Sequence, residues 1–466
     1  MRKSVIADII PMAVAAAGVF CVAYLWISAD AAPQLEQRVP IASNVSAESA
    51  GEEGDVLARA ELTTYGGTPS ELPGVWPHFR GPDRDAIGKV DVTLSRSWSA
   101  QGPPVLWSLD LGEGYAGAAV LGGRVFVADY DQDKQGDAIR CFSLADGQEI
   151  WRYFYPVKVK RNHGMSRTVP AVTDQSVVTI GPKCHVTCLD AATGELKWFL
   201  DLVKDYGAKV PNWYAGQCPL VEEGKVILGV GGEALMIAVD LETGQVLWRT
   251  ANPRGWQMTH SSIVPIEFAG RRMYVWCASG GVVGVAADDG TLLWEVDEWQ
   301  IRMANVPTPL PVGDGRILFS GDYNAGAMML ALSEENGQIV AKPEFRLEPQ
   351  VFGSPQHTPI LYEGHIYGIR PDKQLVCLDL EGNVVWTSGS DHTFGLGPYT
   401  IVNGLIYLLD DHGLLTLAEA QSGSYVQLAQ AQVLHGIDAW GPMAVAENRL
   451  IVRDLTKMVC LDIAAQ

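Results

Sequence analysis

The sequence has no long run of lysine and arginine, and acidic residues outnumber basic ones. Its 466 residues include 34 Lys and Arg against 54 Asp and Glu, which gives a formal net charge of −20. The basic residues Lys158, Lys160 and Arg161 form only a local cluster, as expected for a solvated loop. Nucleic acids and anionic membrane surfaces are both bound through basic patches, so the charge balance argues against either as a partner.

Short motifs that mark catalysis or metal binding are also missing. The stretch Gly229–Ala234 resembles a dinucleotide-binding glycine fingerprint, but the next residues, Leu235–Val239, form a strand pattern where that motif requires a helix. Cys184–Cys188 contains the residues of a haem-attachment motif in the wrong order, and the histidines form no short metal-binding pair. We therefore predict no catalytic residue, no metal site and no cofactor.

What the sequence does contain is one short phrase that returns at regular intervals. The phrase is an apolar residue or Cys, a Leu or Val, an acidic or small residue, a Gly turn, and a Trp four residues after the Gly. The glycines of the clear copies are Gly147, Gly194, Gly244, Gly290 and Gly382, and their tryptophans are Trp151, Trp198, Trp248, Trp294 and Trp386. Two degenerate copies turn at Asn336-Gly337 and Ser422-Gly423, with Ala341 and Gln427 at the Trp position. The turn glycines are 41 to 50 residues apart, and such a period, with four short strands per unit, is typical of a β-propeller.

The last copy is incomplete, and the start of the repeat region supplies what it lacks. Strands are expected at Met443–Val445, Leu450–Arg453 and Met458–Asp462, but no fourth strand follows. Upstream of the first copy, Val105–Leu109 forms an unpaired strand pattern that carries Trp107. We therefore predict an all-β fold, an eight-bladed propeller of four-stranded antiparallel blades closed by this N-terminal strand, since closure removes an open sheet edge.

The tryptophans of the repeat are predicted to be structural. Each would lie on the outermost strand of its blade and pack against the neighbouring blade, because one blade alone cannot bury so large a ring. These docking residues are Trp107, Trp151, Trp198, Trp248, Trp294 and Trp386. Trp299 falls outside the repeat phase, so its truncation is expected to cost much less stability than that of Trp198.

The cysteines follow the same repeat. Cys141, Cys188, Cys377 and Cys460 occupy one position in different copies, as expected for small buried apolar residues of the third strand. Cys184 and Cys188 are four residues apart on an extended segment, roughly 13 Å and too far for a disulfide. We expect few disulfides or none.

The N-terminal region has a pattern of its own. Arg2-Lys3 precede 19 uncharged residues from Ile9 to Ile27, which is long enough to span a membrane, and the positive charges place the N-terminus in the cytoplasm. The predicted organisation is a cytoplasmic N-terminus (1–8), a transmembrane helix or signal anchor (9–27), a flexible acidic linker (28–75), a lead-in segment (76–104) and the propeller (105–466). This predicts a single-pass protein of the inner (cytoplasmic) membrane with a periplasmic propeller. Cleavage near Ala31, where small residues fit a signal-peptidase site, would instead give a secreted form.

The loops just before the first strand of each repeat should meet on one face of the ring, because they share one repeat phase. We predict that they line the mouth of the central channel with aromatic anchors and hydrogen-bonding groups. The predicted binding residues are Tyr115, Arg167, Trp213, Tyr214, Gln217, His260, Asn305, His357 and Trp440. The alternative is that these side chains only fill the channel and satisfy the loop backbone.

The phrase Cys188-Leu189-Asp190-x-x-Thr193-Gly194-x-x-x-Trp198 resembles the tryptophan-docking repeat of PQQ-like β-propellers, over about Val105 to Ile463. The stretch Trp76–Arg84 similarly resembles the segment that precedes such propellers in exported proteins. Quinoprotein alcohol dehydrogenases of this superfamily use an adjacent Cys-Cys disulfide, a bound calcium and a catalytic Asp. The sequence has no Cys-Cys dipeptide, so the resemblance is closest to the non-enzymatic BamB-like propellers.

The sequence therefore predicts a membrane-tethered, extracytoplasmic scaffold that binds a protein or peptide partner in the cell envelope. The resemblance implies a role in envelope or outer-membrane protein assembly. Two alternatives stay open, a quinoprotein-type oxidoreductase that binds PQQ and a glycan-binding propeller.

Overall fold

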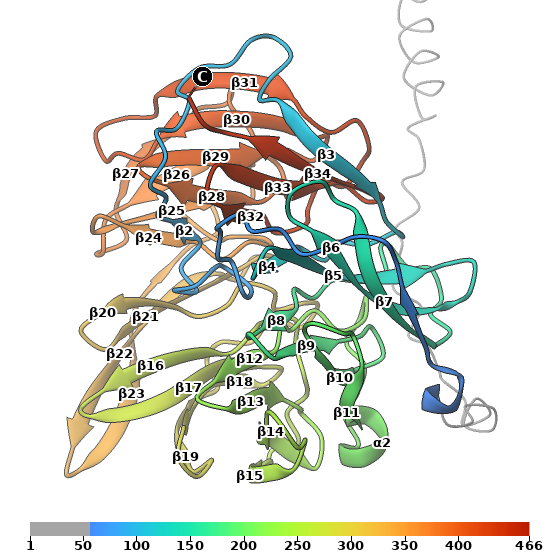
Figure 1. Cartoon of the computed structure of the whole chain (residues 1–466). Helices are drawn as coiled ribbons and strands as arrows, with labels where there is room; N and C mark the ends of the chain where they lie inside the picture. The colour runs from blue at the N-terminus through green and yellow to red at the C-terminus, as the bar shows by residue number, and fades with distance from the viewer. Residues whose placement is uncertain (1–55, 466) are drawn as a thin grey trace, which may run out of the picture. The chain divides into compact units, whose positions relative to one another are not determined.

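The computed structural model describes residues 56–465, and almost all of their regular structure is β-strand (Figure 1). The strands form eight separate sheets, and the short first strands of neighbouring sheets contact one another around a common axis. The predicted fold class is confirmed, an all-β eight-bladed propeller of four-stranded antiparallel blades.

Blades 1 to 4 each use four consecutive strands, which follow one another from the channel outward. They are β4 (Ala119–Leu121), β5 (Arg124–Asp131), β6 (Gly136–Ser143) and β7 (Glu149–Pro156); β8 (Ala171–Val172), β9 (Ser176–Ile180), β10 (His185–Asp190) and β11 (Leu196–Asp201); β12 (Leu220–Glu222), β13 (Lys225–Gly229), β14 (Ala234–Asp240) and β15 (Val246–Ala251); and β16 (Val264–Phe268), β17 (Arg271–Ala278), β18 (Gly281–Ala286) and β19 (Leu292–Val296). A single α-helical turn in the described part, α2 (Leu202–Tyr206), follows β11.

Blades 5 to 7 repeat this order. They are β20 (Leu310–Gly313), β21 (Arg316–Gly321), β22 (Gly326–Glu335) and β23 (Gln338–Leu347); β24 (Ile360–Tyr362), β25 (His365–Ile369), β26 (Leu375–Leu378) and β27 (Val384–Thr387); and β28 (Tyr399–Val402), β29 (Leu405–Leu409), β30 (Leu414–Glu419) and β31 (Gln427–Gln432).

Blade 8 combines the two ends of the propeller sequence. Its strands β32 (Ala444–Ala446), β33 (Arg449–Arg453) and β34 (Lys457–Asp462) are followed in the sheet by β3 (Val105–Asp110), which pairs antiparallel with β34. Trp107 of β3 lies opposite Cys460, and its indole Nε1 donates a hydrogen bond to the Leu144 carbonyl of blade 1 at 2.9 Å. The N-terminal strand therefore completes the sheet of blade 8 and also contacts blade 1.

Part of the segment assigned to a flexible linker is ordered. After the 3-10 turn η2 (Val56–Arg59), strand β1 (Glu61–Thr64) pairs antiparallel with β7 as a fifth strand on the outer edge of blade 1. All four side chains of β1 are exposed, so backbone hydrogen bonds hold the strand and no apolar pattern reveals it. The segment assigned to the linker therefore includes one turn of 3-10 helix and one strand paired with the propeller. The predicted transmembrane segment Ile9–Ile27 lies outside the described residues, and among the described ones no helix is long and apolar enough to cross a membrane.

The docking tryptophans explain why glycine recurs at the turns. Trp198, on the outermost strand of blade 2, donates through Nε1 to the Leu241 carbonyl of blade 3 at 2.8 Å, and its ring lies against Gly244. A Cβ at Gly244 would come within 2.7 Å of the indole, and its φ of +73° also disfavours other residues. Trp151, Trp248 and Trp386 donate to carbonyls of the next blade in the same way.

Cysteine recurs because a small residue is needed beneath each indole. Cys188 lies directly opposite Trp198 in the β10–β11 pair, and Cys141, Cys377 and Cys460 lie opposite Trp151, Trp386 and Trp107. Ala238 and Gly284 take this place opposite Trp248 and Trp294. The seven cysteines of the described part are all buried free thiols, and four of them, Cys141, Cys188, Cys377 and Cys460, are those whose burial the repeat phase predicted.

The two degenerate copies correct the assignment of the Trp position. In each intact blade a β-bulge adjoins the residue opposite the Trp. In blade 5 the equivalent residue is Phe345, opposite Met329, and in blade 7 it is Ala429, opposite Leu417, rather than Ala341 and Gln427. The β22–β23 hairpin is extended, so its Asn336-Gly337 turn lies beyond the docking position. Trp294 of blade 4 accordingly donates to Met273 Sδ of its own blade at 3.3 Å.

Trp299 contradicts the expectation drawn from its phase. Although it lies outside the repeat, it is only 1% exposed and packs against Phe319 with ring centroids 6.2 Å apart. Burial of this size predicts a stability cost similar to that of a docking tryptophan. Repeat phase identifies the residues that dock between blades, but not every residue that fills the core.

Candidate binding cavity

The lead-in segment closes the channel from within the ring. Residues 76–88 hydrogen-bond to the innermost strands of several blades: Trp76 pairs with Val120, the Pro77 carbonyl accepts from Val172 N at 2.7 Å, and β2 (Ile87–Gly88) pairs parallel with β28. The buried Arg80 guanidinium donates to the carbonyls of Thr358 and Pro359 in blade 6 at 2.9 and 3.0 Å. The segment thus spans the axis as a plug.

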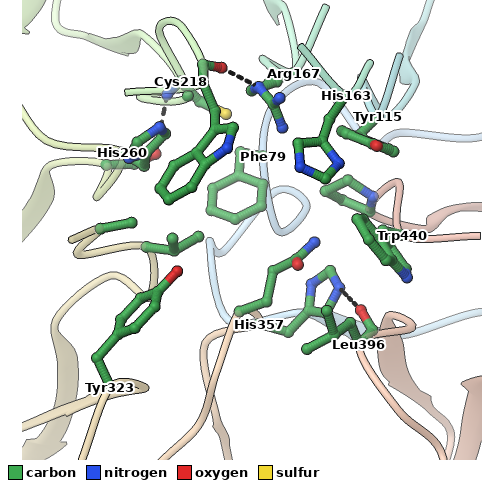
Figure 2. A pocket seen from close by; sticks show the side chains of 17 residues that line it. Phe79, Tyr115, His163, Arg167, Cys218, His260, Tyr323, His357, Leu396 and Trp440 are labelled. Atoms are coloured by element: carbon green, nitrogen blue, oxygen red, sulfur yellow. Dashed lines mark hydrogen bonds between the residues drawn. The ribbon is translucent and has the colours of Figure 1, made fainter. Parts of the chain in front are cut away.

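A cavity of about 290 Å³ lies above this plug. Its lining includes residues from the loops before the first strand of all eight blades, together with Tyr323 from the β21–β22 turn and Phe79 from the plug. Figure 2 shows the Phe79 ring at the centre, with Arg167 and His163 to one side and His357 to the other. The convergence follows from the shared repeat phase, and Phe79 makes the cavity a blind one.

Six of the nine predicted rim residues line this cavity. They are Tyr115, Arg167, Trp213, His260, His357 and Trp440. The other three serve the loops instead. Gln217 is buried and holds the Gly229 backbone through both amide atoms, the Tyr214 hydroxyl donates to the Lys160 carbonyl, and the Asn305 carbonyl accepts from His260 N at 3.1 Å. For Gln217 and Tyr214 the structure shows the backbone-satisfying role that the sequence left open as the alternative, whereas Asn305 is buried and only its main-chain carbonyl makes this bond.

Aromatic and cationic groups are layered along one wall. The Arg167 guanidinium lies over the Tyr115 ring at 5.0 Å, and Tyr115 contacts Trp440 with ring centroids 5.1 Å apart. The Tyr115 hydroxyl donates to Asp438 at 3.1 Å, and Trp440 Nε1 donates to Asp411 at 2.9 Å. The two carboxylates therefore accept hydrogen bonds from the aromatic wall and are not part of the cavity lining.

Burial sets the charge state of the lining. Burial, together with the smaller repulsion from Arg167, lowers the pKa of His260 to about 4. The pKa of His357 is also lowered to about 4, mainly by burial, although its ring hydrogen-bonds the Leu396 carbonyl at 2.9 Å. Both imidazoles are therefore neutral at pH 7, and Arg167 is the permanent cation among the lining residues.

The loop that carries Trp213 is held in an unusual backbone conformation. Trp213 and Tyr214 have consecutive φ values of +60° and +74°, a region that costs a non-glycine residue about 1–2 kcal/mol. Arg167 Nε donates to the Trp213 carbonyl, and the Tyr214 amide donates to Pro211 O at 3.0 Å. These contacts fix the indole against the cavity before any ligand arrives.

Sequence reasoning missed several lining residues. His163 and Leu396 belong to loops in the expected phase but were not singled out, and Tyr323 comes from a turn of another phase. Phe79 lies in the lead-in, which was recognised only by its resemblance to exported propellers. The sequence signal that points to it is an aromatic residue between Pro77 and Gly81, outside the repeat.

The donor set does not fit the calcium that quinoprotein dehydrogenases use. Calcium prefers carboxylate and carbonyl oxygens, and the cavity lining includes no Asp or Glu. Within residues 56–465, no three His, Cys, Asp or Glu side chains gather as a metal site. No calcium-assisted step is therefore assigned to this cavity.

The fold and cavity define the class as an eight-bladed PQQ-like propeller with a plugged axial channel. The chain belongs to the family described as outer membrane protein assembly factor BamB, whose sequence profile matches residues 134–388. No curated protein sequence matches the chain significantly.

Solved structures with the same fold are distant in sequence. BamB from Moraxella catarrhalis is similar with a TM-score of 0.53 at 15% identity, over 77% of this chain and 99% of that one. A europium-containing methanol dehydrogenase is similar with a TM-score of 0.59 at 13% identity, over 82% and 89% of the two chains. A computationally designed protein gives 0.52 at 13% identity, over 78% and 100%. These likenesses show the fold alone.

Proposed function

We propose that this propeller is a binding scaffold that holds a protein or peptide partner at the face where the cavity opens. The observation that carries the proposal is the cavity, which is blind, lined from all eight blades and walled by fixed aromatic rings. Membership of the BamB family supports a partner in the cell envelope and a role in envelope or outer-membrane protein assembly.

The rim of the cavity supports the same function. Ile437, Tyr323 and Met303 are 59%, 46% and 39% exposed, and all three lie in loops that also contribute to the lining or adjoin residues that do. Apolar side chains gathered around a concave site are typical of protein contact surfaces. They add exposed apolar surface to the loops that form the cavity, which a partner would cover.

Affinity capture from envelope extracts tests the proposal. The variants Ile437→Asp and Met303→Asp place charge on the rim, and Val385→Asp places it on the exposed outer strand of blade 6 as a matched control. We expect the rim variants to lose a discrete partner that the wild-type chain and the control retain. Equal recovery by all of them would contradict a partner at this face.

Membrane tethering belongs to the proposal as well. We propose that Ile9–Ile27 anchors the chain in the inner membrane as a single span with the propeller in the periplasm. Its support is the length of the uncharged segment and the preceding Arg2-Lys3. A tether of this kind would keep the cavity face near envelope partners.

A second candidate is an oxidoreductase that binds a quinone in the same cavity. The observation in its favour is the pairing of aromatic walls with the Arg167 cation, while the absence of lining carboxylates counts against the calcium-assisted version. Incubating the full chain with PQQ and calcium and recording its absorbance separates the two. A tight stoichiometric quinone chromophore would favour the oxidoreductase.

A further inference from the structure

The cavity carries the opposite charge to the chain around it. The whole chain has a formal charge of −20, yet the lining contains one permanent cation and no Asp or Glu. The neighbouring imidazoles of His260 and His357 are neutral, so they supply hydrogen-bonding groups and apolar surface rather than charge. The cavity is therefore electrostatically suited to an anion.

Arg167 is placed to receive that anion. Its guanidinium bonds to backbone carbonyls, those of Trp213 and Asn162, and no carboxylate among the described residues pairs with it. Burial lowers its pKa to about 10, which reflects the cost of holding a cation away from water. A carboxylate entering the cavity would offset this cost through a charge-assisted hydrogen bond.

The shape of the cavity restricts the ligand to something short. Its volume of about 290 Å³ is at the small end of ligand pockets, which range over roughly 300–1,000 Å³. Phe79 closes the floor, so an extended segment cannot pass through. The aromatic walls of Trp213 and Trp440 need an apolar body to cover them.

Together these features point to the end of a chain. We propose that the cavity binds the C-terminal residue of a peptide partner, with Arg167 pairing with the α-carboxylate and the aromatic wall enclosing a large apolar side chain. A single terminal residue supplies both the charge and the apolar surface, whereas an internal Asp or Glu supplies only the charge. A cationic ligand, which aromatic cages often hold, would be repelled by Arg167. This inference rests on the proposed binding function and names the partner's chemistry.

Titration calorimetry with three probes tests the proposal on the full chain. The probes are N-acetyl-glycyl-glycyl-phenylalanine as the free acid, the same peptide as its C-terminal amide, and N-acetylphenylalanine. We expect the free-acid peptide to bind at least about tenfold more tightly than its amide, because only the acid offers a charge-assisted bond. We also expect it to bind more tightly than N-acetylphenylalanine, because the longer chain contacts the rim.

Two variants assign the effect to Arg167. Arg167→Gln should abolish the preference for acid over amide, and Arg167→Lys should retain part of it. The matched control Arg161→Gln removes an exposed arginine that pairs with Glu113 outside the lining, and it should leave the preference intact. If Arg167→Gln does not fold, the preference in the wild-type chain must still weaken as salt is raised.

Several results would overturn the proposal. Equal affinity for acid and amide, no binding of either peptide, or an unchanged preference in Arg167→Gln would each refute the carboxylate contact. Tighter binding of N-acetylphenylalanine than of the peptide would assign the cavity to a free acid. If the probes fail while the Ile437 and Met303 variants still lose a partner, the scaffold function stands and only this inference falls.

Discussion

At the scale of single residues, the docking tryptophans account for both the glycines and the cysteines of the repeat. Four of the indoles, those of Trp107, Trp151, Trp198 and Trp248, lie between a small residue on their own blade and a turn glycine on the next, as Trp198 does between Cys188 and Gly244. Neither neighbour can grow without displacing the ring. The repeated sequence phrase therefore reflects one packing arrangement, in which a Trp of one blade docks on the next.

Truncating a docking tryptophan tests this packing. Trp198→Ala should lower the free energy of unfolding by about 3–5 kcal/mol, because it removes a buried ring and leaves a gap between blades. Leu247→Ala is the control, since Leu247 is exposed on an outermost strand and should cost little. Denaturant unfolding of the two variants compares them, and equal losses would contradict the docking arrangement.

A buried carboxyl between blades 1 and 2 gives a pH dependence. Asp137 is buried and accepts a hydrogen bond from the Tyr155 hydroxyl at 2.6 Å, and burial raises its pKa from 3.8 to about 7. The folded state thus binds a proton that the unfolded state has released between these pH values. Stability contributed by this group is complete below about pH 4 and is lost as the pH rises towards 7, by up to about 1.4 kcal/mol per pH unit.

Asp137→Asn should remove that slope and raise the melting temperature at pH 8. The exposed Asp133→Asn should change neither. Melting curves recorded from pH 4 to pH 8 provide the measurement. A slope that persists in Asp137→Asn would show that another group carries it.

At the scale of elements, hydrophobic periodicity predicted the blade strands well and the edge additions poorly. The strands expected at 450–453 and 458–462 appear as β33 and β34 with small shifts at their ends, because a short buried apolar run between turn residues leaves a clear pattern. Strand β1 exposes all four side chains and pairs with β7 through its backbone, so no apolar pattern predicts it. In blade 5 the Trp position was assigned to Ala341 by counting from the turn glycine. The structure places it at Phe345, because the docking residue lies next to the β-bulge whatever the length of the hairpin.

Removing β3 tests its place in blade 8. Deleting residues 1–113 takes away the strand that pairs with β34 and exposes that edge, so we expect aggregation. Deleting residues 1–55 leaves every described strand in place and is the control. Size-exclusion chromatography of both proteins is decisive, since a monomeric 114–466 fragment that melts like the control would refute a role for β3 in closing the ring.

At the scale of the whole molecule, repeat phase located the face of the cavity but not its floor. Loops of one phase converge by symmetry, which is why six of the predicted residues meet. Three residues of the same phase do not line the cavity: the side chains of Tyr214 and Gln217 hydrogen-bond to backbone, and Asn305 is buried. Phe79 enters from outside the repeat, so no periodic argument could place it.

The N-terminal segment makes a prediction for the intact protein. If Ile9–Ile27 is an uncleaved span, the mature protein retains its first residues and sediments with membranes after carbonate washing. The physical reason is that 19 residues at about 1.5 Å each cover nearly the hydrocarbon thickness. Intact-mass measurement checks this, and a mature N-terminus at Ala32 would instead indicate a secreted propeller.

The most direct test of the central claim is site-specific photo-crosslinking in living cells. A photoreactive amino acid at Ile437 stands on the rim of the cavity, and one at Val385 stands on the exposed outer strand of blade 6. We expect a discrete crosslinked partner from position 437 and none from position 385. Crosslinks of equal yield from both positions, or none from position 437, would contradict a partner bound at the cavity face.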